Sequence, residues 1–190
     1  MQPNKDTFSS EELDLLVDKA VTGDAESFGS LYDLYVERIY RHLYFRVNNV
    51  NDAEDLTHQV FIKAWKAIRR YKRTSIPFIA WLLKIAQNLV IDFYRSKKDT
   101  DFLKPDFEIM SPDAGPQQQL EADFEQTRLR KTILQLQDEH QQVITMRFID
   151  ELSYEEIASA LNKSEGAIRV IQHRALKKMR EILEGEKDRD

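Results

Sequence analysis

The sequence predicts an all-α protein made of two small helical domains joined by a flexible acidic linker, the C-terminal domain being a helix-turn-helix. The 190 residues include only five glycines and five prolines among many Leu, Ile, Ala, Glu and Lys residues, which favour helices. Apolar residues recur at helical spacing on both sides of one irregular stretch. That stretch, residues 99–119, combines prolines and acids without a helical period, which is typical of a linker.

The first expected helix begins at a capping box. Ser9 and Glu12 have the spacing in which each side chain bonds the other's backbone N–H, and Phe8 and Leu13 are placed for a hydrophobic staple. The helix is expected to end near Gly23.

Two further amphipathic helices follow. One is expected to begin after Asp24 and to end at Asn48-Asn49, and the next to begin at Asn51 or Asp52. The apolar stripe of the first consists of Phe28, Leu31, Tyr35, Ile39 and Leu43. The stripe of the second consists of Leu56, Val60, Ala64 and Ile68.

A fourth helix follows Pro77, a residue suited to a first helical turn. Trp81 falls on the apolar stripe of this helix, so its ring is expected to pack in the core. The stripe consists of Phe78, Trp81, Leu82, Ile85, Leu89 and Phe93. The N-terminal domain is therefore expected to span residues 8–98.

The second domain is expected to span residues 120–185. Leu120 to Leu136 should form one helix, and Asp138 with Gln141 should cap a second. The apolar residues of that second helix are Val143, Ile144 and Phe148.

A helix, a short turn and another helix follow. Ser153 and Glu156 form another capping box, Asn162 can adopt the left-handed conformation that ends a helix, and Ser164 can cap the next one. The last helix can bury Ile168, Ala175, Leu176 and Met179. Its other face presents a basic ridge suited to a DNA major groove, formed by Arg169, His173, Arg174 and Lys177.

The net charge of −5 is unevenly distributed. Residues 100–126 carry one basic side chain against seven acids, whereas residues 61–98 carry ten basic side chains and one acid. Residues 163–180 carry six basic side chains and one acid. Such runs are often only solvated helix faces, but two basic faces flanking an acidic connector also suit a partner rich in phosphates.

Several classes of protein are excluded or disfavoured. The sequence has no cysteine, hence no disulfide or thiolate site, and a reducing cytoplasm is the expected setting. No apolar run approaches the roughly 20 residues that cross a bilayer, so no direct membrane insertion is expected. The four histidines lack metal-ligand spacing and no phosphate loop or nucleophile elbow is present, so no catalytic residue, metal or cofactor is predicted.

The stretch from Arg69 to Pro77 combines basic groups, one aromatic ring and small hydroxyls ahead of a helix. Unpaired bases are stabilised by aromatic surfaces and polar pockets, so this composition suits capture of a base from opened DNA. Asn88, on the following helix, can read a base edge with its amide.

Three runs of residues resemble the extracytoplasmic-function (ECF) class of the sigma-70 family of bacterial RNA polymerase sigma factors. Residues 52–65 resemble the segment that binds the polymerase clamp, and residues 81–95 resemble the adjoining part that melts and reads the minus-ten element. Residues 152–176 resemble the helix-turn-helix that reads the minus-thirty-five element. The chain departs from the family pattern at His58 and Gln59, where Gln and Glu are usual.

The resemblance implies a function and three sets of residues. The chain would bind core RNA polymerase, direct it to promoter DNA and help to open the strands, and an anti-sigma factor is an expected partner. Polymerase binding would involve Asp52, Glu54, Asp55, His58 and Gln59. The melted element would contact Tyr71, Lys72, Arg73, Thr74, Ser75, Lys84, Asn88 and Arg95. The upstream element would contact Ser164, Arg169, His173, Arg174 and Lys177.

Two alternatives stay open on the residues alone. A dimeric helix-turn-helix repressor or activator would explain residues 120–183 equally well but leaves the motifs of residues 52–95 unexplained. The second alternative is a helical adaptor that binds only protein. It would leave the two basic faces, in residues 61–98 and 163–180, without a role.

Overall fold

The computed structural model describes residues 9–72, 77–100 and 117–187. Within these ranges the chain forms eight α-helices and no strand, which confirms the all-α prediction. Residues 101–116, most of the predicted linker, lie outside the described ranges, as does the predicted staple residue Phe8. Both ends of the predicted linker are helical, because α4 continues to Thr100 and α5 starts at Gln117.

The N-terminal half contains the four predicted helices. Their bounds are Ser10–Val21 (α1), Ala25–Tyr44 (α2), Val50–Ala67 (α3) and Phe78–Thr100 (α4), with a 3-10 turn at Ile68–Arg70 (η1). The Ser9 capping box is present: Ser9 Oγ accepts from the N–H of Glu12 at 3.2 Å, and Glu12 Oε2 accepts from the N–H of Ser9 at 2.7 Å. Helix α2 ends at Tyr44, earlier than predicted, and Asn49 instead caps α3, accepting from the N–H of Asn51 at 2.7 Å.

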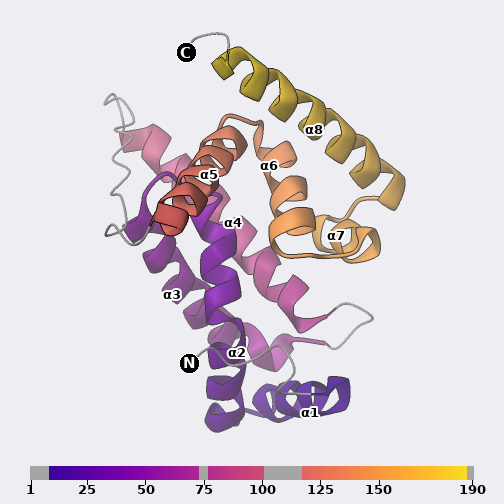
Figure 1. The fold of residues 1–190 in the computed structure, drawn as a ribbon. Coiled ribbons are helices and arrows are strands. Elements are labelled where there is room, and N and C mark those ends of the chain that lie inside the picture. The colour runs from indigo at the N-terminus through magenta and orange to yellow at the C-terminus, as the bar shows by residue number, and fades with distance from the viewer. Residues whose placement is uncertain (1–8, 73–76, 101–116, 188–190) are drawn as a thin grey trace.

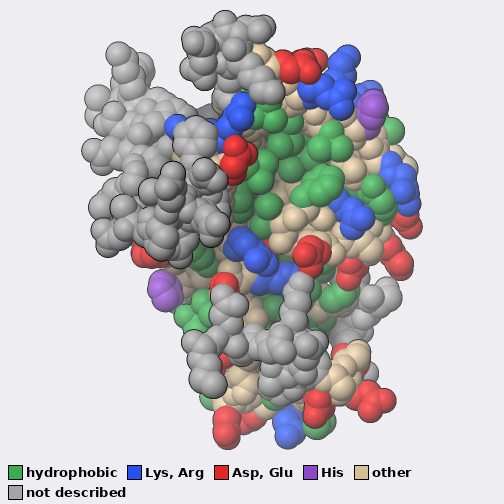
Figure 2. Space-filling view, in the orientation of Figure 1, with side chains coloured by type: hydrophobic (Ala, Val, Ile, Leu, Met, Phe, Trp, Pro, Cys, Tyr) green, Lys and Arg blue, Asp and Glu red, His purple; other side chains and the backbone are tan. Residues whose placement is uncertain are grey.

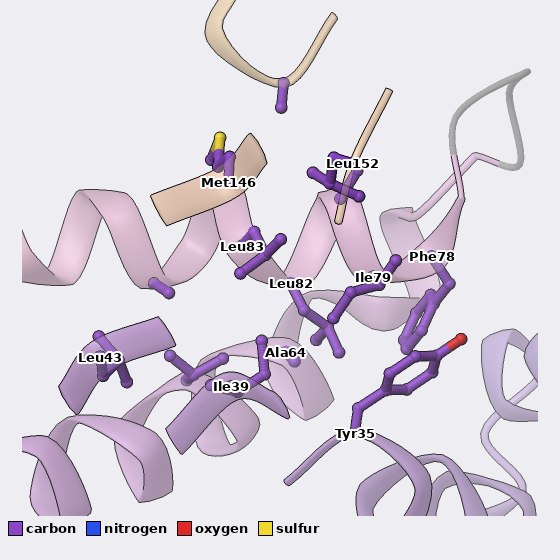
Figure 3. Close-up of a cluster of buried hydrophobic side chains, with 14 of the residues drawn as sticks. Tyr35, Ile39, Leu43, Ala64, Phe78, Ile79, Leu82, Leu83, Met146 and Leu152 are labelled. Carbon is purple, nitrogen blue, oxygen red and sulfur yellow. The ribbon is translucent and has the colours of Figure 1, made fainter. Parts of the chain in front are cut away.

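The predicted stripes form most of the core of this half. Leu31, Ile39, Leu43 and Leu82 are fully buried. Figure 3 shows Tyr35, Ile39 and Leu43 of α2 facing Ala64 of α3 and the α4 residues Phe78, Ile79 and Leu82. Burial of this many aliphatic and aromatic side chains, each worth about 1.5–3 kcal/mol, holds the four helices together.

The C-terminal half contains four further helices. Their bounds are Gln117–Leu134 (α5), Asp138–Ile144 (α6), Tyr154–Leu161 (α7) and Glu165–Lys187 (α8), with a π-helical turn at Thr145–Ile149 (η2). The predicted cap at Asp138 is wrong. Gln137 occupies the N-cap position and makes no side-chain bond there, while the Asp138 carboxylate accepts from Arg46 and from Gln142.

Leu176, predicted to be buried, and Phe148, an apolar residue of the second expected helix of this half, are both exposed. Phe148 is 51% exposed and Leu176 is 41% exposed. Phe148 lies in η2, where the wider π turn contains an extra residue and rotates the following side chains away from their α-helical positions. Leu176 follows the buried Ala175, at the edge of the apolar face of α8.

The sequence predicts two domains joined by a flexible linker. In the structure the two halves pack against each other. Figure 1 shows α7 lying beside α4, and η2 contacts α2. One apolar cluster contains core residues of α1–α4 together with Met146, Leu152 and Ile157. In Figure 3, Leu83 of α4 points toward Met146 and Leu152. The two domains therefore form one body in this structure.

Candidate nucleic-acid interface

The predicted helix-turn-helix is present in α7 and α8. Ser153 Oγ accepts from the N–H of Glu156 at 3.2 Å, and the Glu156 carboxylate accepts from the N–H of Ser153 at 2.6 Å. Asn162 ends α7 in the left-handed conformation, with φ 54° and ψ 49°. Ser164 Oγ accepts from the N–H of Ala167 at 3.2 Å and so caps α8. The local sequence thus sets both the start of each helix and the turn between them.

The predicted basic ridge lies on the surface of α8. Arg169, His173, Arg174 and Lys177 are all exposed. Figure 2 shows blue Lys and Arg side chains and a purple His gathered at the upper right, over α8. The Arg169 guanidinium lies 3.8 Å from the centre of the Tyr154 ring and 3.3 Å from a Glu165 carboxylate oxygen. The ridge thus has the charge and exposure that binding to phosphates and base edges requires.

A second candidate site lies where the chain enters α4. Tyr71, Phe78 and Trp81 form an aromatic group, with ring centres 4.9 Å apart for Tyr71 and Trp81 and 5.3 Å for Phe78 and Trp81. A pocket of about 200 Å³ opens beside these rings. Its walls are Arg70, Tyr71, Lys72, Ala80, Trp81, Lys84, Ser159 and Ala160.

Of the remaining residues predicted to contact the melted element, some are exposed and others lie outside the described residues. Lys72, Lys84, Asn88 and Arg95 are exposed, the last three along α4. Arg95 also lies 3.7 Å from Asp92. Arg73, Thr74 and Ser75 lie outside the described residues. Trp81 packs partly against the core, as expected, and also lines the pocket.

The predicted polymerase-binding residues lie on α3. Glu54, Asp55, His58 and Gln59 are exposed, whereas Asp52 forms an ion pair with Lys97 at 3.0 Å. Four of the five predicted side chains are therefore directly available to a protein partner.

An apolar groove between α2 and α3 adjoins His58 and was missed by the sequence analysis. It has a volume of about 440 Å³ and is lined mainly by Phe28, Tyr32, Phe61, Ile62 and Trp65. The Trp65 ring lies 4.9 Å from Phe28, and Ile62 and Trp65 are 53% and 39% exposed. The signal in the sequence is that Ile62 and Trp65 lie off the buried stripe of α3.

Two buried ionisable groups were also missed. The Arg46 side chain is fully buried, and this burial lowers the pKa of its guanidinium while the Asp138 carboxylate opposes the shift. His42 Nδ1 lies 2.6 Å from a carboxylate oxygen of Asp150, and both side chains are fully buried. Neither residue lies in a motif, and their partners are distant in the sequence, so no local pattern indicates them.

Other classes of site were searched within the described ranges. No cluster of three or more His, Asp or Glu side chains there could hold a metal ion. No helix in the same ranges combines the length and apolar character needed to cross a membrane.

Comparisons with known proteins match both halves of the chain. Residues 31–100 match the family described as Sigma-70 region 2, and residues 133–181 match Sigma-70, region 4. The chain is 32% identical over 187 residues to the ECF RNA polymerase sigma factor BldN of Streptomyces coelicolor, covering 96% of this chain and 69% of that protein. It is 30% identical over 171 residues to the ECF RNA polymerase sigma factor SigW of Bacillus subtilis, covering 85% of this chain and 91% of that protein.

Two solved structures share the fold. CnrH, solved in complex with the cytosolic domain of CnrY, superposes with a TM-score of 0.70 at 24% identity, covering 90% of this chain and 96% of that chain. The sigma factor RpoE, solved in complex with the anti-sigma factor NepR from Bartonella quintana, gives a TM-score of 0.68 at 19% identity, covering 84% of this chain and 98% of that chain.

Proposed function

Because this chain belongs to the ECF class of sigma-70 family RNA polymerase sigma factors, we propose that its surfaces divide promoter recognition, strand opening and polymerase binding between them. The family function is promoter-directed initiation of transcription. Residues 8–98 act as region 2, residues 120–185 act as region 4, and residues 99–119 connect them.

Region 4 recognises the minus-thirty-five element through the ridge on α8. Arginine and lysine can donate to guanine edges or to phosphates, and each good base contact is worth about 1–3 kcal/mol of discrimination. The residues assigned to this contact are Ser164, Arg169, His173, Arg174 and Lys177. Ser164 caps α8 by accepting from the N–H of Ala167, and the other N–H groups at the start of that helix can bind a phosphate.

Region 2 captures the opened minus-ten element at the start of α4. A flipped base can stack on the Tyr71 and Trp81 rings, while Lys72 and Lys84 attract the backbone phosphates. Asn88 tests a base edge one turn after Lys84, and Arg95 continues the basic track along α4. Arg73, Thr74 and Ser75, which lie outside the described residues, are assigned to the same contact.

Core polymerase binds the exposed side of α3. Glu54, Asp55, His58 and Gln59 supply the polar contacts, and Asp52 supports them through its ion pair with Lys97. The adjoining groove around Ile62 and Trp65 supplies apolar area, since interface centres are enriched in aromatic and aliphatic side chains. The contact thus combines a charged rim with an apolar centre.

The chain acts in the cytoplasm as a binding protein without enzymatic activity or cofactor. An anti-sigma factor is proposed as its regulator, and the structure of RpoE with NepR gives one example of such a pairing in a protein of the same fold.

A single observation carries the proposal: one chain combines an exposed basic ridge on a helix-turn-helix with a basic, aromatic pocket at the start of α4. The test is run-off transcription from a promoter library by purified core polymerase with and without the protein, with sequencing of the start sites. Start sites that share two elements at fixed spacing are expected. Tight duplex binding by a dimer of the free chain, with no polymerase-dependent start sites, would instead identify a repressor or activator.

A further inference from the structure

The outward side of α8 carries one apolar side chain among its basic ones. Val170 is 49% exposed, whereas Ile168, Ile171 and Ala175 of the same helix are buried. Successive residues of an α-helix are rotated by about 100°, so Val170 lies away from the side of α8 that these three occupy. The outward side also includes Gly166, His173 and Lys177.

The fold of the chain does not account for a valine at this position. A β-branched residue lowers helix stability relative to alanine or lysine, and a half-exposed side chain gains little from burial. Single exposed apolar residues are ordinary on protein surfaces, so the place of this one is what matters. Val170 lies within the basic ridge, next to Arg169 and one turn before His173 and Arg174. An apolar group at the centre of this surface is suited to contact an apolar group of the DNA.

Gly166, one turn before Val170, is equally unexplained by the fold. Glycine lowers helix stability relative to alanine and is used where the backbone needs a positive φ or where another group must approach closely. Gly166 has no positive φ. Apart from its own helix backbone and the adjacent residues, the nearest described atom to a Cβ placed on it is Ser164 Oγ at 4.0 Å. The chain therefore leaves room for a side chain here, and the close approach of another molecule is the remaining reason for glycine.

The chemistry of the major groove indicates which group Val170 would contact. In a helix-turn-helix, the N-terminal residues of the second helix face the base edges in this groove, and Gly166 and Val170 are the second and sixth residues of α8. Thymine is the base that displays a methyl group there, and apolar side chains contact it. The branched side chain of valine holds its own methyl groups in a fixed direction, so it can meet the thymine methyl without losing rotational freedom.

We propose that Val170 contacts the methyl group of a thymine in the minus-thirty-five element, and that Gly166 lets α8 approach the base edges closely enough for this contact. The inference rests on the function proposed above, because it takes the target of region 4 as given. It adds to the ridge an apolar contact that distinguishes thymine from cytosine, whose edge carries no methyl group. Arg169 and Arg174, on either side of Val170, are suited to guanine edges or phosphates instead.

The contact can be tested by removing one methyl group from the DNA. Deoxyuridine lacks the C5-methyl group of thymidine but keeps its hydrogen-bonding groups. Each thymine of the minus-thirty-five element, on both strands, is replaced in turn in a promoter obtained from the run-off library. The affinity of the full chain with core polymerase is then measured for each DNA. One replacement should weaken binding about fourfold, the effect expected for the loss of one buried methyl group.

Val170→Ala should remove this dependence on the methyl group. At the sensitive position the unchanged protein should favour thymine over deoxyuridine about fourfold, whereas Val170→Ala should bind the two DNAs within about 1.5-fold of each other. A general loss of helix stability or of phosphate contacts would weaken binding to both DNAs equally and leave the ratio unchanged. Leu176→Ala is the matched control, because it truncates another exposed apolar side chain of α8, 41% exposed, and should keep the fourfold ratio.

A second variant tests the close approach at Gly166. Gly166→Ala should leave the free energy of unfolding unchanged or raise it, because alanine favours the helix. It should nevertheless weaken promoter binding at least about tenfold, since an added methyl group is poorly tolerated in a closely packed contact. Gly185→Ala is the matched control: Gly185 is also an exposed glycine of α8 with open space at its Cβ position, and its replacement should not change promoter affinity. Urea unfolding and promoter affinity are measured on both variants.

The results that would overturn this inference differ from those that would overturn the proposed function. A productive polymerase complex that has no methyl-sensitive thymine, or that keeps the same ratio in Val170→Ala, would overturn the contact alone. Unchanged promoter affinity in Gly166→Ala would overturn the close approach at that residue. If the unchanged protein gives no run-off transcript with core polymerase, the proposed function fails, and the contact that depends on it fails as well.

Discussion

Arg169 lies over the ring of Tyr154, its guanidinium carbon 3.8 Å from the ring centre. Tyr154 is the first residue of α7 and Arg169 belongs to the second turn of α8. A cation–π contact of this kind contributes about 0.5–1 kcal/mol at an exposed site. The two helices of the motif therefore fix the direction in which this arginine leaves the surface before any DNA arrives.

The first prediction concerns that arginine. Arg169→Ala should cost about 1–3 kcal/mol in binding of the polymerase complex to its promoter and relax the preference at one position of the upstream element. Competition between promoters that carry each base at each position measures this. Lys178→Ala is the matched control, because Lys178 lies on another face of α8 and pairs with Glu181 at 3.2 Å. If both variants lost the same promoter affinity on every sequence, Arg169 would only attract phosphates and would not read a base.

The second prediction concerns base capture. Replacing residues 71–77 with the loop of another ECF factor should change the preferred minus-ten base, while upstream recognition and polymerase binding persist because they use other helices. Asn88→Ala should weaken the same step. Open-complex formation on promoters with each base at the melted position, read by permanganate reactivity of unpaired thymines, measures both. An unchanged base preference in the chimera would mean that residues 71–77 only connect the flanking helices and do not select the base.

The third prediction concerns the apolar groove. Ile62→Asp should weaken binding of core polymerase at least about tenfold, since it places a charge in the apolar centre of the proposed contact. Ile62 is 53% exposed, so the fold should tolerate the change. Glu37→Lys, on the exposed face of α2, is the control for altered surface charge. Affinity for labelled core polymerase is the measurement, and wild-type affinity in Ile62→Asp would exclude the groove from the contact.

The fourth prediction concerns alkaline pH. Burial raises the pKa of Tyr35 from its ordinary value of 10 to about 12. The folded state thus holds this proton more tightly than the unfolded state, so its contribution to stability is complete below pH 10 and is lost as pH rises toward 12. Two pKa units correspond to about 2–3 kcal/mol. Urea unfolding between pH 9 and pH 12 should show this loss, and Tyr35→Phe should show a smaller one. Equal slopes for both proteins would contradict it.

The fifth prediction concerns the turn of the helix-turn-helix. Asn162 has a φ of 54°, so Asn162→Val should lower the free energy of unfolding by about 1–2 kcal/mol. Asn162→Gly should change it by less than about 0.5 kcal/mol, because glycine adopts this conformation without strain. Urea titration followed by circular dichroism compares the two.

Local signals in the sequence predicted the local structure well. The capping boxes at Ser9 and Ser153 and the left-handed turn at Asn162 each depend on residues within four positions of one another, and all three are present. The exposed ridge on α8 was predicted for the same reason. These features depend on residues that are close together in the sequence, so a local pattern is enough to predict them.

Long-range contacts were not predictable in this way. Asp138 has the sequence pattern of a cap, but its carboxylate bonds instead to the buried Arg46 of the N-terminal half. Phe148 has apolar spacing for an α-helix, but the π turn moves it to the surface. The packing of the two halves depends on partners far apart in the sequence that no periodic pattern relates, such as His42 with Asp150 and Arg46 with Asp138, 108 and 92 residues apart.

The π turn at Thr145–Ile149 affects the orientation of the chain that follows it. A π turn accommodates one residue more than an α-helical turn, so a substitution that made Thr145–Ile149 an ordinary α-helix without removing a residue would rotate the chain that follows by about 100°. Asp150, 0% exposed in its side chain and paired with His42, would then lose its contact with the N-terminal half, while the helix-turn-helix itself stayed intact. The π-helical geometry of this short segment therefore contributes to how α7 and α8 are oriented on the rest of the molecule.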